Sequence, residues 1–74
     1  MSKSRSNFVR LAEGRTNKIL KAIDLLSNLS NRTNYSYNEA DIKKIFAAIE
    51  GKMRDARARF ELRLKAKNDD KFKL

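Results

Sequence analysis

Arginine and lysine are the residue types in this chain that are best suited to a chemical role. The 74 residues include 18 Lys and Arg against 9 Asp and Glu, which gives a net charge of +9. Arginine supplies forked donors that match phosphate oxygens, whereas lysine supplies a point charge. A net charge of this size attracts polyanions over a distance. The composition therefore favours ionic binding as the chemistry of this chain.

Catalytic and metal-binding groups are scarce. The chain has no Cys and no His, so it can form no disulfide and no thiolate or imidazole metal site. The remaining nucleophiles are Ser, Lys and carboxylates, and no base is placed to activate one of them. A chain of this length also lacks the depth for a substrate pocket. We therefore expect no enzyme, no metal and no cofactor.

The elements that carry the charges are predicted to be helices, because residues that compete with helices cluster at one place. Proline is absent, and Ser, Asn and Thr dominate the segment 27–38, which reads SNLSNRTNYSYN. One such segment implies two helices and an all-α fold. We predict a helix over 7–29, a loop over 30–38, a helix over 39–67 and a short polar tail over 68–74.

Capping residues support both predicted helix starts. Ser4 or Ser6 is the candidate N-cap of the first helix. The signal for the second helix is clearer, because Asn38 can cap it. Glu39 and Asp41 then place negative charge in its first turn, where backbone N–H groups are unsatisfied.

The apolar side chains predict how the helices pack. Those of the first helix cover an arc wider than one neighbour can bury, and those of the second repeat at heptad spacing. Two helices with a short connection pack antiparallel, and a chain this short usually needs a partner. We expect one domain over 1–74, an antiparallel helical hairpin that forms a homodimeric four-helix bundle. A monomer docked on a larger assembly is the alternative. The expected dimer and core residues are Ile19, Ile23, Leu26, Ile42, Phe46, Ile49, Met53 and Phe60.

The basic residues are unevenly distributed along the chain. Residues 1–22 carry six of them against Glu13, and residues 51–67 carry seven against two acids, whereas residues 23–50 sum to −1. Folding at the loop would bring the two basic zones side by side at the open end of the hairpin. Such a concentration predicts a surface that binds nucleic acid, DNA or RNA, through its backbone. The expected contact residues are Arg5, Arg10, Arg15, Lys18, Lys52, Arg57, Arg59, Arg63 and Lys67.

Other interpretations of the charge stay open. Part of the second helix could be an ordinary surface with ion pairs one turn apart. The candidate pairs are Glu50–Arg54, Asp55–Arg59 and Glu61–Lys65. That would leave Lys52, Arg57, Arg63 and Lys67 without local partners. The basic helices could also dock on an acidic protein as an inhibitor or regulator, or belong to a structural subunit of a ribonucleoprotein particle.

The loop and the termini carry weaker signals. Tyr35 and Tyr37 could stack on unpaired bases, or they could cover the end of the helical bundle. The N-terminal segment lacks the apolar run of a signal peptide, and no stretch reaches the length of a membrane span. We expect a cytoplasmic protein that does not bind a membrane.

The segment 15–50, RTNKILKAIDLLSNLSNRTNYSYNEADIKKIFAAIE, resembles a pattern in short bacterial proteins, some of them carried on plasmids or phages. That resemblance covers about half of the chain and implies a bacterial, mobile-element setting. The expected architecture is also similar to that of Rop-like helical hairpins, which dimerise and bind paired RNA loops. This second similarity is one of shape, and shape does not carry function.

Overall fold

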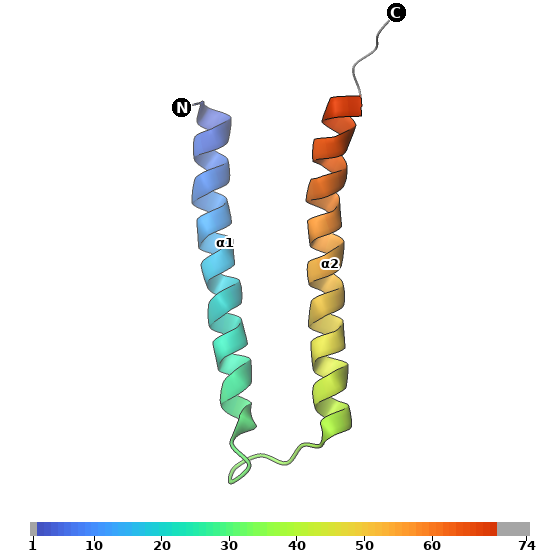
Figure 1. The fold of residues 1–74 in the computed structure, drawn as a ribbon. Helices are drawn as coiled ribbons and strands as arrows, with labels where there is room; N and C mark the ends of the chain where they lie inside the picture. Colours follow the sequence, from blue (N-terminus) through green and yellow to red (C-terminus); the bar gives the residue numbers. More distant parts are fainter. Residues whose placement is uncertain (1, 70–74) are drawn as a thin grey trace, which may run out of the picture. The chain divides into compact units, whose positions relative to one another are not determined.

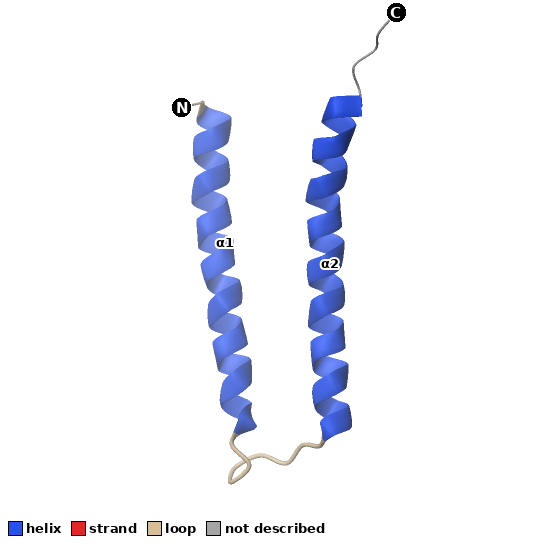
Figure 2. Cartoon of the chain, in the orientation of Figure 1, coloured by secondary structure: helices blue, strands red, loops and turns tan. Residues whose placement is uncertain are grey.

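In a computed structural model of the chain, the backbone is described for residues 2–69 and the side chains for residues 2–66. The described residues form two α-helices and a short 3-10 helix, with no strand among them (Figure 1; Figure 2). The prediction of an all-α fold is therefore confirmed. The chain divides into two units, Met1–Ser36 and Tyr37–Leu74, and each unit is described by itself.

Helix α1, Lys3–Ser27, is the main element of the first unit and begins earlier than predicted. Its N-cap is Ser2, whose Oγ accepts a hydrogen bond of 3.0 Å from the backbone N–H of Arg5. Ser4 and Ser6, the expected caps, lie inside the helix, so that prediction is wrong. All three serines can cap, and no residue between Ser2 and Asn7 breaks a helix, so the outermost serine takes the role.

Helix α1 ends at Ser27, two residues before the predicted end at 29, within the segment rich in Ser and Asn. The hydroxyl of Ser27 donates to the carbonyl oxygen of Asp24 at 2.7 Å, and the 3-10 helix η1, Asn28–Ser30, follows. Asn31 then organises a turn: its Oδ1 accepts from the N–H of Thr33 at 3.0 Å, and its carbonyl oxygen accepts from the N–H of Tyr35 at 3.0 Å. Side-chain competition for backbone groups therefore ends the helix, as expected for these residue types.

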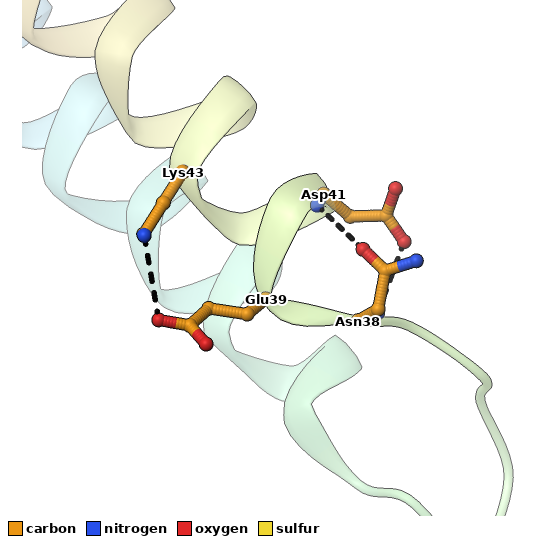
Figure 3. Close-up of polar contacts among 4 residues, drawn as sticks. All are labelled: Asn38, Glu39, Asp41 and Lys43. Atoms are coloured by element: carbon orange, nitrogen blue, oxygen red, sulfur yellow. Dashed lines mark hydrogen bonds and ion pairs between the residues drawn. The ribbon is translucent and has the colours of Figure 1, made fainter.

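Helix α2, Glu39–Asp69, begins at the predicted residue. Asn38 Oδ1 accepts from the N–H of Asp41 at 2.9 Å, and the N–H of Asn38 donates to Asp41 Oδ2 at 3.1 Å (Figure 3). This reciprocal pair satisfies two backbone donors at once, which is the arrangement of a capping box. The helix continues two residues beyond the predicted end at 67, and the rest of the predicted tail lies outside the described residues.

Neither unit buries an apolar side chain. No side chain among residues 2–66 is buried, and large apolar residues such as Ile19, Met53 and Phe60 are more than half exposed. A single helix cannot cover its own apolar face. No helix in the described part of the chain is long and apolar enough to cross a membrane.

Gly14 lies in the interior of α1 although nothing in the structure requires a glycine there. A Cβ built at this position would meet no atom within 4 Å. Because glycine in a helix costs about 0.5–1 kcal/mol relative to alanine, Gly14→Ala is expected to raise the free energy of unfolding by that amount. Thermal unfolding followed by circular dichroism measures the change. Lower stability instead would mean that a partner packs against the backbone at Gly14.

Candidate nucleic-acid interface

The C-terminal half of α2 holds the densest group of basic residues. Residues 51–66 carry Lys52, Arg54, Arg57, Arg59, Arg63 and Lys65, and their side chains are all exposed. The helix begins at a strong cap and contains no proline, so it places these six cations on one continuous backbone. Asp55 and Glu61 are the acids of this segment, which leaves a net charge of +4.

One carboxylate in this half engages a cation. Arg57 Nε lies 3.7 Å from Glu61 Oε1, and both side chains are largely exposed. The other five cations form no ion pair and no side-chain hydrogen bond with any residue whose side chain the structure describes. We call these five, Lys52, Arg54, Arg59, Arg63 and Lys65, the unpaired cations of α2.

Two expectations about ion pairing are therefore wrong. None of the three pairs expected in α2 forms within the described side chains, whereas Arg57, expected to lack a local partner, pairs with Glu61. Such pairs on an exposed helix contribute about 0.3–0.5 kcal/mol each, and holding two long side chains together costs entropy. Spacing alone does not decide which of several competing pairs forms. Arg54 and Lys65, which were expected to pair with Glu50 and Glu61, are therefore added to the candidate interface.

The predicted contact residues of α2 lie along both edges of its apolar seam, which consists of Ile42, Phe46, Ile49, Met53, Ala56 and Phe60. At about 100° per residue, Lys52, Arg59 and Arg63 share one edge of this seam. Arg57 lies on the opposite edge, beside its partner Glu61. The helix therefore brings Lys52, Arg59 and Arg63 together and places Arg57 apart from them. The side chain of Lys67, the fifth, lies outside the described residues.

Helix α1 distributes its predicted contact residues around its circumference. Arg5 lies over the ring of Phe8, with 5.8 Å from the guanidinium carbon to the ring centroid. Arg15 lies on the apolar face, one turn from Ile19, whereas Arg10 lies on the polar face. Lys18 lies between these two faces. The N-terminal half of α1 is basic, but it does not present its cations as one stripe.

Six of the eight predicted dimer and core residues are exposed within their own unit. Ile19, Met53 and Phe60 are 57%, 60% and 61% exposed, and Phe46 is 44% exposed. Leu26 and Ile49 are half-buried. These side chains are therefore available to a partner, as residues of an unpaired helix face would be.

Comparison with protein families, with characterised proteins and with solved structures finds no match to this chain.

Proposed function

We propose that this chain is a small basic nucleic-acid-binding protein that contacts the phosphate backbone with weak sequence preference. The observation that carries the proposal is the set of five unpaired cations in the C-terminal half of α2. Exposed cations that form no ion pair leave their charge available to an external polyanion.

The spacing of these cations suits a phosphate backbone. From Lys52 to Lys65 the helix rises by roughly 20 Å, at about 1.5 Å per residue. Double-stranded DNA carries one negative charge per about 1.7 Å of its axis, so the three cations on one side of the helix, Lys52, Arg59 and Arg63, can each find a phosphate. At about 100° per residue, Arg54 and Lys65 lie together on another side of the helix. The chain shows no pattern that reads base edges, such as a zinc finger or an aromatic RNA-binding motif. Phosphate contacts fix position on the nucleic acid but carry no sequence information.

The proposed functional form is an antiparallel helical hairpin that dimerises into a four-helix bundle. The apolar side chains that both helices expose support this form, because a partner would bury them. A single core in a chain of 74 residues rarely provides more than about 3–5 kcal/mol of folding free energy, so a chain of this size usually needs such a partner. In such a hairpin the basic N-terminal half of α1 lies beside the basic half of α2. The proposal implies a cytoplasmic protein with access to nucleic acid, and a plasmid or phage setting agrees with it.

Salt titration tests the proposed function. With the three phosphate contacts that Lys52, Arg59 and Arg63 can make from one side of α2, the logarithm of the affinity for a random DNA duplex is expected to fall against the logarithm of the salt concentration with a slope of about −3. Fluorescence anisotropy with labelled duplex DNA and an RNA hairpin measures both affinities. If neither probe binds at about 0.1 M salt, the proposal is abandoned, and an acidic protein becomes the preferred partner.

A further inference from the structure

The apolar seam of α2 is uninterrupted along its length, which distinguishes it from the apolar face of α1. Its residues follow one another at spacings of four, three, four, three and four, and none of them is charged. On α1 the same periodicity places Arg15 between Ala12 and Ile19, so a cation interrupts that face. A heptad seam packs best against another heptad seam. The partner that offers one on this chain is α2 of a second copy.

Opposite charges terminate the seam. One heptad step before Phe46 the sequence has Glu39, and one step after Ala56 it has Arg63. Both side chains are exposed; Arg63 has no partner among the described side chains, and Glu39 Oε1 lies 3.5 Å from Lys43 Nζ in an exposed ion pair. The C-terminal half of the helix carries +4, whereas residues 39–50 sum to −1. Parallel pairing of two copies would place Glu39 beside Glu39 and Arg63 beside Arg63. Antiparallel pairing would place Glu39 beside Arg63 at both ends.

We propose that the α2 seam binds the α2 seam of a second copy in antiparallel orientation, with Glu39 next to Arg63 of the other copy. The same alignment sets Phe46 against Ala56, which matches a large side chain with a small one. It also sets Ile42 against Phe60 and Ile49 against Met53. The inference rests on the proposed dimer and names its interface and its orientation.

Cysteine cross-linking tests the orientation of the two α2 helices. Because the chain has no cysteine of its own, only the introduced thiols can react. Glu39→Cys and Arg63→Cys are prepared as separate variants and treated with a short thiol cross-linker, each alone and then mixed, without nucleic acid. Covalent dimer is expected in the mixture and not in either variant alone. Dimer from each variant alone would show parallel pairing and overturn the inference. Absence of cross-linking in all three samples would overturn it as well.

A charge exchange provides a second measurement that does not depend on cysteine. Arg63→Glu alone and Glu39→Arg alone are each expected to weaken dimerisation at least about tenfold in sedimentation equilibrium, because like charges then meet at both ends. The double variant is expected to recover most of that loss. If the chain dimerises but the double variant shows no recovery, another face forms the dimer. Because Arg63 is also one of the unpaired cations of α2, dimerisation of these variants is measured without nucleic acid, and nucleic-acid binding is tested with substitutions at other positions.

Discussion

Phe60→Ala is expected to lower the melting temperature by at least about 10 °C at micromolar protein concentration. Phe60 is 61% exposed in the chain alone, but it lies in the α2 seam that the proposed dimer buries. Truncation of a buried phenylalanine to alanine costs about 3–5 kcal/mol, and a domain of this size loses about 4–8 °C per kcal/mol. Thermal unfolding by circular dichroism at several protein concentrations measures the effect. The melting temperature should also become more dependent on concentration, since weaker association shifts the equilibrium toward monomer.

Leu62→Ala is the matched control for this experiment. Leu62 is 68% exposed, close to the value for Phe60, and lies on the same helix. It projects from the side away from the α2 seam, so its truncation is expected to change the melting temperature by less than about 3 °C. Equal effects of the two substitutions would show that the seam has no special role. An unchanged melting temperature for Phe60→Ala would argue against the dimer.

Local rules predict most of the secondary structure of this chain. The start of α2 follows from Asn38 and Asp41, whose capping interaction involves residues three apart in sequence. The start of α1 was less predictable, because Ser2, Ser4 and Ser6 are chemically equivalent caps. The end of α2 was placed too early, since Asn68 and Asp69 have low helix propensity but do not block a helix that is already formed.

The candidate interface was less predictable than the helices. Exposed ion pairs differ in free energy by a few tenths of a kcal/mol, so spacing rules could not choose between Glu61–Lys65 and Arg57–Glu61. Helical periodicity does place Lys52, Arg59 and Arg63 on one edge of the α2 seam, and it separates Arg10 from Arg15 on α1. What lies against the seam depends on contacts between residues that are distant in sequence or belong to another molecule. Periodicity predicts that a partner is needed but does not identify it.

Charge reversal at Arg59 and Lys65 is expected to weaken nucleic-acid binding about 10- to 100-fold at 0.1 M salt. Both side chains belong to the unpaired cations of α2, and Arg59 lies on one side of the helix and Lys65 on another. Neither lies in the α2 seam, so the reversal removes a phosphate contact from whichever side binds and leaves the dimer core intact. Each lost contact should also reduce the slope of log affinity against log salt by about one. Anisotropy titrations of Arg59→Glu with Lys65→Glu at several salt concentrations measure both quantities.

Reversal of Lys43 and Lys44 provides the control with the same change in net charge. Both lie in the first turns of α2, outside the basic half, and Lys43 is 3.5 Å from Glu39 Oε1 in an ion pair (Figure 3). If binding depends on local contacts, Lys43→Glu with Lys44→Glu should keep most of the affinity and most of the salt slope. If both double variants lose affinity equally, net charge alone attracts the nucleic acid. The C-terminal half of α2 would then not be a specific binding surface, because the affinity of a surface that contacts phosphates directly must depend on which cations are reversed.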